Sequence, residues 1–177
     1  MKKASIIDTE QLLLREVTWD DLQSWHEILS DEETMQYYPK PFDLTKTKQW
    51  IQWNLDNYSK YGFGLWAVIL KETNQFIGDC GMTMQNIHGK LSPEIGFHLN
   101  KKFWRKGYAS EAAKACLAYA FEHTDFDEIY CYQKYTNIPS RKMAEKMGMT
   151  LREEYPDKVN TKTSVYSITK SEFNAWH

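Results

Sequence analysis

The chain has 177 residues, 42% of them hydrophobic, and a formal net charge of −2. This length can bury one sizeable core but is short for two, so we expect a single domain over 1–177. Proteins that bind nucleic acids or membrane surfaces need a clustered basic excess, which this chain lacks. Neither kind of partner is therefore expected.

The N-terminus and the cysteines limit the cellular context. Lys2 and Lys3 could begin a signal peptide, but no apolar region follows them, and no later run approaches membrane-spanning length. We therefore expect a cytoplasmic protein, either a monomer or a homodimer. Cys80, Cys116 and Cys131 are odd in number and lack metal-ligand spacing, so buried thiols and no metal site are expected.

Apolar spacing predicts strands and helices in alternation. The prolines at 39 and 41 bar a helix interior, so 37–42 is expected to be a break. The aromatic residues of that break either line the mouth of a pocket or anchor a loop to the core. Before the break we expect a strand over 11–17 and two short helices, the second beginning at 30–33. After it we expect a helix over 45–58 that Gly62 ends, and antiparallel strands over 65–70, 75–84 and 94–99.

The second half of the chain completes a mixed sheet. A helix over 110–121 and a strand over 128–132 form a crossover, which should be right-handed and place this strand parallel to 94–99. These two strands, the fourth and fifth, must separate where a ligand enters. A helix over 141–147 and an antiparallel pair, 151–155 and 163–168, close the chain. The expected fold is α/β (α+β), with helices on both faces of a mostly antiparallel sheet of six to seven strands.

The turn Trp104–Ala109 lies between a predicted strand and a predicted helix. A helix N-terminus presents N–H groups without intrahelical partners, and the helix dipole adds about half a positive charge there. Gly107 allows a ligand to approach the backbone, and Arg105 and Lys106 add full charge. The turn therefore predicts a phosphate or pyrophosphate site.

Other phosphate-binding loops do not fit the sequence. No Walker loop is present, because no glycine-lysine pair is followed by serine or threonine at the required spacing. The stretch 62–67 nominally matches a dinucleotide fingerprint. It leads into an apolar strand rather than a helix, which excludes that interpretation.

The turn resembles the acyl-CoA pyrophosphate loop of the GNAT acetyltransferases, whose pattern is Gln or Arg, two residues, Gly, one residue, then Gly or Ala. Gly107 and Ala109 match the fourth and sixth positions, and Trp104 departs from the first. A Trp at the first position resembles the loop of one branch of the family, the ribosomal-protein N-acetyltransferases. The stretches 137–140 and 145–149 resemble the motif that closes over the pantetheine arm in that branch.

The resemblance implies acetyl-CoA as the cofactor and assigns roles to particular residues. Backbone groups of Phe97, His98 and Leu99 would meet the pantetheine, Asn137 would bond the same arm, and Ser140 would lie near the sulfur. The pyrophosphate would be held by the amides of Arg105, Lys106, Gly107, Tyr108, Ala109 and Ser110.

Acetyl transfer requires a group that takes a proton from an amine. Glu94 is the first candidate, directly or through water; alternatively it only attracts the substrate ammonium. His98 shares its strand face and is the second candidate, or a packing residue. Ser140 either donates a proton to the leaving sulfur or caps a helix, and Tyr135 is the tyrosine nearest to that segment.

The resemblance implies an N-acetyltransferase that moves an acetyl group from acetyl-CoA to a primary amine by direct attack in a ternary complex. The amine is either a protein N-terminal α-amine or a small molecule. Two alternatives stay open: a non-catalytic CoA-binding regulatory module, and a nucleotide-binding protein, against which the missing Walker sequence argues.

Overall fold

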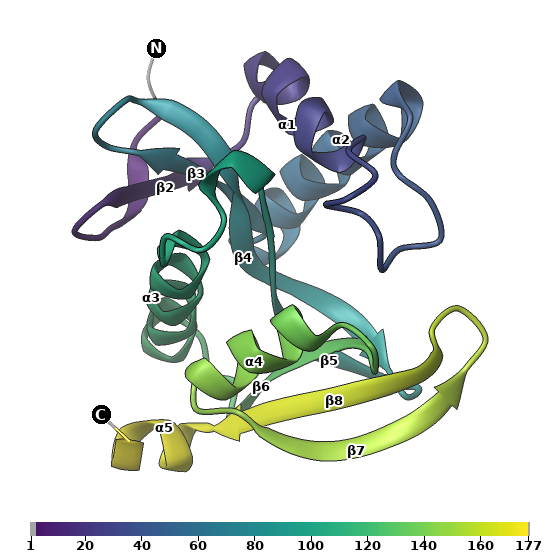
Figure 1. Cartoon of the computed structure of the whole chain (residues 1–177). Coiled ribbons are helices and arrows are strands. Elements are labelled where there is room, and N and C mark those ends of the chain that lie inside the picture. The colour runs from purple at the N-terminus through teal and green to yellow at the C-terminus, as the bar shows by residue number, and fades with distance from the viewer. Residues whose placement is uncertain (1–2, 177) are drawn as a thin grey trace.

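The computed structural model describes residues 3–176 (Figure 1). Met1, Lys2 and His177 lie outside the described residues. The first lysine of the expected Lys2–Lys3 pair and the two ends of the expected 1–177 domain are therefore not described. The described strands are β1 (Ser5–Asp8), β2 (Leu12–Glu16), β3 (Leu65–Leu70), β4 (Gln75–Ile87), β5 (Lys90–Leu99), β6 (Glu128–Lys134), β7 (Thr150–Asp157) and β8 (Thr161–Thr169). The described helices are α1 (Leu22–Leu29), α2 (Leu44–Tyr61), α3 (Tyr108–His123), α4 (Ile138–Lys146) and α5 (Lys170–Trp176), with 3₁₀ turns η1 (Trp19–Asp21) and η2 (Lys101–Phe103).

The eight strands of the described chain form one mixed sheet in the order β1-β2-β3-β4-β5-β6-β8-β7. Every neighbouring pair is antiparallel except β5 and β6, which are parallel and connected through α3. The fold class is thus confirmed, but the sheet has eight strands, one more than the upper end of the expected six to seven. The extra strand is β1, whose four residues are too short to show an alternation and gain their order by pairing with β2.

The sheet opens between β5 and β6, as expected. These strands share one register pair, Glu94 with Tyr130. β5 continues to Leu99 with β4 on its other side, so within residues 3–176 its edge beyond Glu94 has no strand partner. Unpaired strand edges carry free N–H and C=O groups, which a ligand can use.

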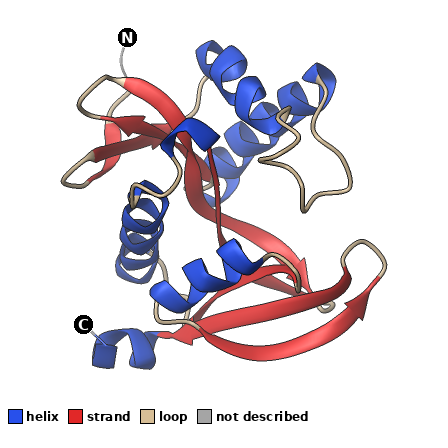
Figure 2. Cartoon of the chain, in the orientation of Figure 1, coloured by secondary structure: helices blue, strands red, loops and turns tan. Residues whose placement is uncertain are grey.

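Helices cover both faces of the sheet (Figure 2). The indole of Trp25 on α1 donates to Asp79, whereas the thiol of Cys116 on α3 is hydrogen-bonded to that of Cys80. Asp79 and Cys80 are adjacent on β4, and adjacent strand residues point to opposite faces. α1 and α3 therefore lie on opposite sides, and His98, which pairs with Asp79, belongs to the α1 side.

One expected helix is absent and one observed helix was not expected. No helix begins at 30–33, because residues 32–37 form turns that end before Pro39. Fewer than two helical turns fit there, and a short helix does not repay its nucleation cost. The sequence reasoning also missed α5, whose Phe173 packs on Phe121 with ring centroids 5.0 Å apart. That partner is distant in the sequence, so local spacing could not reveal it.

The cysteines are buried, free thiols, as expected. The bond to Cys116, followed by burial, raises the pKa of Cys80 well above its ordinary value, and burial does the same for Cys131. Both thiols therefore stay protonated and behave as core residues. No helix among residues 3–176 combines the length and apolar character needed to cross a bilayer.

Candidate active site

A cavity of about 280 Å³ lies where the sheet opens. Five predicted site residues line it: Glu94, Phe97, His98, Asn137 and Ser140. Its other walls include the aromatic side chains Tyr37, Tyr38, Trp50 and Trp53. The structure thus brings together residues that lie up to 123 positions apart (37 to 160). Of the two interpretations of the 37–42 break, the pocket mouth is the one observed for Tyr37 and Tyr38.

Glu94 lies on β5 in the wall of this cavity, partly accessible to solvent. Its one hydrogen bond within the described residues comes from the backbone N–H of Tyr132, 3.4 Å from Oε2. Burial raises the pKa of Glu94 to about 8, and the Tyr132 bond only partly offsets this. A carboxyl group with this pKa can exchange a proton near neutral pH, as a general base requires.

A chain of hydrogen bonds connects Tyr38 to the interior. The Tyr38 hydroxyl lies 2.7 Å from Nε2 of His98, and Nδ1 of His98 lies 3.0 and 3.1 Å from the two Asp79 carboxylate oxygens. Asp79 also accepts the indole N–H of Trp25 at 2.7 Å. His98 and Asp79 are buried. Tyr38 is a candidate functional residue that sequence reasoning missed, because the sequence signal was only an aromatic cluster beside prolines.

The start of α4 supplies Asn137 and Ser140. Asn137 is the N-cap, and its Oδ1 accepts the Ser140 backbone N–H at 3.2 Å. The alternative that Ser140 caps the helix was therefore wrong. Within residues 3–176 the Ser140 hydroxyl has no hydrogen-bond partner, which leaves it available to a ligand. Tyr135 does not line the cavity, and its carbonyl accepts from Arg141.

The turn before α3 has the geometry of an anion site. Gly107 is the N-cap at φ 84°, Arg105 is also left-handed at φ 62°, and the first helical bond runs from Glu111 N–H to the Gly107 carbonyl. The amides of 105–110 make no hydrogen bond to any part of the chain that the structure describes. A Cβ added at Gly107 would meet no atom within 4 Å. The amides are therefore both unsatisfied and open to approach.

Trp104 fixes this turn to the end of β5. Its indole N–H donates to the Leu99 carbonyl at 2.8 Å. Leu99 does not line the cavity and has its carbonyl occupied, so the structure separates it from Phe97 and His98, with which it was grouped. The tryptophan that departs from the loop pattern thus has a structural partner of its own.

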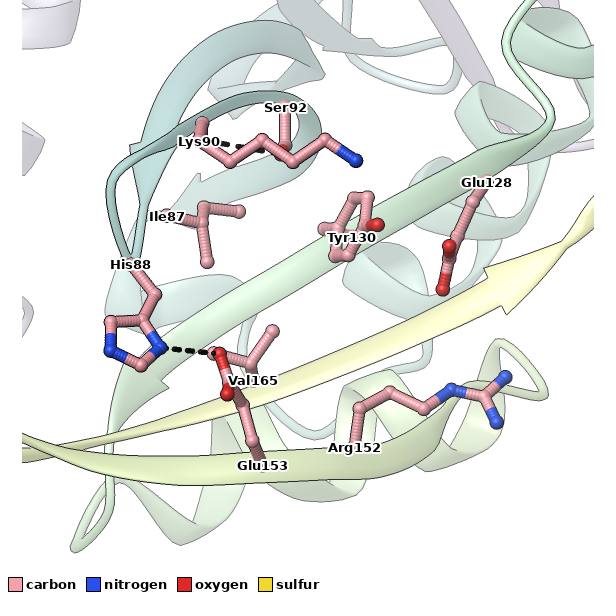
Figure 3. A pocket seen from close by; sticks show the side chains of 9 residues that line it. All are labelled: Ile87, His88, Lys90, Ser92, Glu128, Tyr130, Arg152, Glu153 and Val165. Carbon is pink, nitrogen blue, oxygen red and sulfur yellow. Dashed lines mark hydrogen bonds and ion pairs between the residues drawn. The ribbon is translucent and has the colours of Figure 1, made fainter.

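A second hollow of about 380 Å³ lies under the tip of the β4–β5 hairpin (Figure 3). Figure 3 shows His88 at that tip joined to Glu153 on β7, with Nδ1 and Oε1 3.0 Å apart. Arg152 beside them donates to the Ser167 hydroxyl and to Glu172. None of the predicted site residues lines this hollow.

Comparison with known proteins agrees with the fold. Residues 11–150 match the family described as "Acetyltransferase (GNAT) domain". The uncharacterized N-acetyltransferase YnaD of Bacillus subtilis is 34% identical over 145 residues, which is 81% of each chain. The chain therefore belongs to the GNAT acetyltransferase family.

Solved structures show the same architecture. A GNAT-family acetyltransferase from Bacillus anthracis is similar with TM-score 0.79 and 29% identity, over 93% of this chain and 98% of that one. The ribosomal-protein α-N-acetyltransferase RimL, solved in complex with coenzyme A, is similar with TM-score 0.78 over 94% of this chain and 98% of that one. RimL is 16% identical to this chain, so this second likeness shows the shared fold alone.

Proposed function

We propose that the protein transfers an acetyl group from acetyl-CoA to a primary amine in a ternary complex. The observation that carries the proposal is the set of amides at 105–110, which lack protein partners at the start of α3. A pyrophosphate satisfies such groups, and the helix dipole, Arg105 and Lys106 add attraction. The unpaired edge of β5 beyond Glu94 provides backbone groups for the pantetheine arm.

The residues of the cavity divide the chemistry between them. When bound, acetyl-CoA supplies the acetyl group as a thioester. Glu94, once ionised, accepts a proton from the substrate ammonium, and Ser140 donates a hydrogen bond to the leaving sulfur. Backbone groups of Phe97 and His98 orient the acetyl donor, together with Asn137. Cys131 lines the cavity, but burial raises the pKa of its thiol well above its ordinary value, so the thiol stays protonated and is a poor nucleophile. Positioning and hydrogen bonding therefore contribute most of the rate.

The charges of the cavity favour an acceptor with a single positive charge. Glu94 is the only acidic residue in its wall, and Lys134 is basic. A polyamine or an aminoglycoside would place several ammonium groups beside one carboxyl group and a lysine. Most of these ammonium groups would lose water without gaining a negative partner, which is unfavourable. The aromatic wall instead suits an amine with an apolar body, whether a peptide N-terminus or a small molecule.

An acceptor panel tests the proposed function. Thiol release from acetyl-CoA is measured with neutral N-terminal peptides, small apolar monoamines, polyamines and aminoglycosides, and acetylated products are identified by mass spectrometry. We expect turnover with the first two classes. Tight CoA binding without turnover of any amine would instead identify a non-catalytic CoA-binding module.

Two glycine substitutions test the pyrophosphate turn. Gly107 and Gly62 have almost the same left-handed φ, 84° and 80°, and each has open space around an added Cβ. Alanine should therefore cost each position a similar backbone strain, about 1 kcal/mol. Only Gly107→Ala should weaken CoA binding in calorimetry, by about tenfold, because only it displaces the amides. Equal CoA affinity in the two variants would refute the assignment of the turn.

A further inference from the structure

Acetylation of an ammonium removes two protons from one nitrogen. The nitrogen starts with three hydrogens and ends as an amide N–H with one. Glu94 can accept one of these protons, but a second acceptor is needed as the C–N bond forms. The cavity wall also holds the Tyr38 hydroxyl, which is connected through His98 to the buried carboxylate of Asp79.

We propose that Tyr38 is a catalytic residue of the transfer: its oxygen accepts the second proton from the attacking nitrogen while its own proton passes to Nε2 of His98. His98 and Asp79 act as positioning residues behind it. This inference rests on the proposed acetyl transfer. Neither the cavity nor the family match assigns such a role to Tyr38.

The hydrogen-bond pattern fixes the direction of the relay. Both Asp79 oxygens lie within 3.1 Å of Nδ1 of His98, and a carboxylate accepts, so the imidazole proton is on Nδ1. In the neutral imidazole Nε2 then carries a lone pair, and the Tyr38 hydroxyl, 2.7 Å away, donates to it. The lone pairs of the phenolic oxygen remain available to a hydrogen on the substrate nitrogen.

The interior positions of His98 and Asp79 make the relay rigid. The Asp79 side chain is fully buried and that of His98 is 8% exposed. Asp79 is held from the other side by the indole of Trp25. Asp79 and His98 also pair across β4 and β5, so the sheet itself sets their distance. A preorganised chain of this kind needs little rearrangement when charge moves through it.

The surroundings of Tyr38 favour proton passage over storage of a phenolate. Tyr38 as a whole is 43% exposed, but desolvation of its hydroxyl beside His98 raises the pKa of Tyr38 far above its ordinary value, and the charges of Glu94 and Asp79 raise it further. Tyr132 and Cys131 on β6 face the same group. The phenol therefore gives up its proton only as it gains another, while His98 becomes an imidazolium beside the Asp79 carboxylate.

The step balances in atoms and charge. The C–N bond forms as the C–S bond breaks, and the electron pair of the C–S bond goes to sulfur. The first ammonium proton is on Glu94. The second is on the Tyr38 oxygen, and the proton that Tyr38 carried before is on Nε2 of His98. One of them then reaches the thiolate, with Ser140 at the sulfur, and the other leaves to solvent. The products are the amide, CoA thiol and one proton.

The main test compares Tyr38→Phe with Tyr61→Phe, each of which removes one hydroxyl and keeps the ring. Tyr61 stacks on Phe63 outside the cavity. With an amine that the wild-type protein acetylates, Tyr38→Phe should lower kcat by about 100-fold and leave KM for acetyl-CoA within about twofold. Tyr61→Phe should leave both within about twofold.

Asp79→Asn tests the positioning chain without touching the substrate. The introduced amide would donate to Nδ1 and force the His98 proton onto Nε2, so that the ring could no longer accept from Tyr38. We expect kcat to fall by about 100-fold, together with the changed tautomer in proton–nitrogen NMR of the ring. If Asp79→Asn does not fold, the tautomer of the wild-type ring and Tyr38→Phe decide the question.

The outcomes separate the relay from the proposed function. A wild-type ring protonated on Nε2, or a Tyr38→Phe variant with wild-type kcat, overturns the relay and leaves acetyl transfer intact. A wild-type protein that binds CoA but acetylates no amine overturns the proposed function and the role of Tyr38 with it. A wild-type ring protonated on Nδ1, combined with a low kcat of Tyr38→Phe, supports the relay.

Discussion

Two hollows of the described chain, the one under the β4–β5 hairpin and the candidate site, differ in how their polar groups are satisfied. The larger, about 380 Å³, holds charges that pair with neighbours, as His88 does with Glu153 and Arg152 with Glu172. The smaller, about 280 Å³, holds a half-buried carboxyl group with a single long hydrogen bond and a hydroxyl without a partner among residues 3–176. Unsatisfied polar groups, rather than volume, therefore mark the candidate site.

The largest expected effect concerns the stability cost of keeping Glu94 unpaired. Its folded pKa of about 8 exceeds its ordinary value of 4.5, so between these pH values the folded protein retains a proton that the unfolded chain has lost. The free energy of unfolding should therefore fall as pH rises through this window. The full pKa shift corresponds to roughly 5 kcal/mol at about 1.4 kcal/mol per pKa unit, and partial solvent access of the carboxyl group reduces the expected fall to about 3 kcal/mol relative to Glu94→Gln.

Urea denaturation of the wild-type protein and Glu94→Gln over a series of pH values measures this difference. Glu153→Gln, in the other hollow, should follow the wild-type curve, because Glu153 is exposed and paired with His88. Parallel curves for the wild-type protein and Glu94→Gln would mean that Glu94 ionises normally. The two hollows would then not differ in how their carboxyl groups are satisfied.

The same pair of glutamates should differ in catalysis. Above about pH 8 we expect Glu94→Gln to lower kcat/KM by about 100-fold, because an ionised acceptor is lost. The loss should shrink at lower pH, where Glu94 of the wild-type protein is itself protonated. Glu153→Gln should stay within about twofold throughout. Steady-state rates across the pH range measure both, and wild-type rates in Glu94→Gln would remove this residue from the mechanism.

The smallest effect compares a serine from each hollow. Ser140→Ala should lower kcat by about tenfold, because the leaving sulfur loses a hydrogen bond. Ser92→Ala should have no effect on kcat, since the Ser92 hydroxyl is bonded to the Lys90 carbonyl in the hollow under the hairpin. Thermal unfolding of Ser140→Ala should match the wild type, because Asn137 caps α4. An unchanged kcat in Ser140→Ala would leave this serine without a catalytic role.

Much of the fold could be predicted where a local pattern carries the structure. β3 was predicted with its observed bounds, and α2 ends at the left-handed Gly62 as expected. The strands 75–84 and 94–99 were predicted too short, because β4 and β5 extend each other by pairing along the hairpin. β1 and α5 were missed, since their order comes from partners outside their own segments.

The candidate site divides in the same way. Asn137 and Ser140 could be named from a motif, and Glu94 from its place on a strand just before the predicted cofactor-binding segment; the cavity brings them together. Tyr38 and Asp79 could not, because a tyrosine in a loop and an aspartate in an apolar strand carry no pattern. Sixty residues separate Tyr38 from the histidine that it bonds. Only pairing of β4 with β5 and packing of the 37–42 loop create that contact.

The sequence by itself determined the order of strands and helices, the glycine turn before α3 and the family to which the chain belongs. These depend on residue spacing and backbone preference, which act over a few neighbours. Tertiary structure alone decided that Glu94 is half-buried without a charged partner, that Asn137 rather than Ser140 caps α4, and that Tyr38 reaches His98. Burial and hydrogen-bond partners are properties of the packed chain, because they depend on residues that only folding brings together.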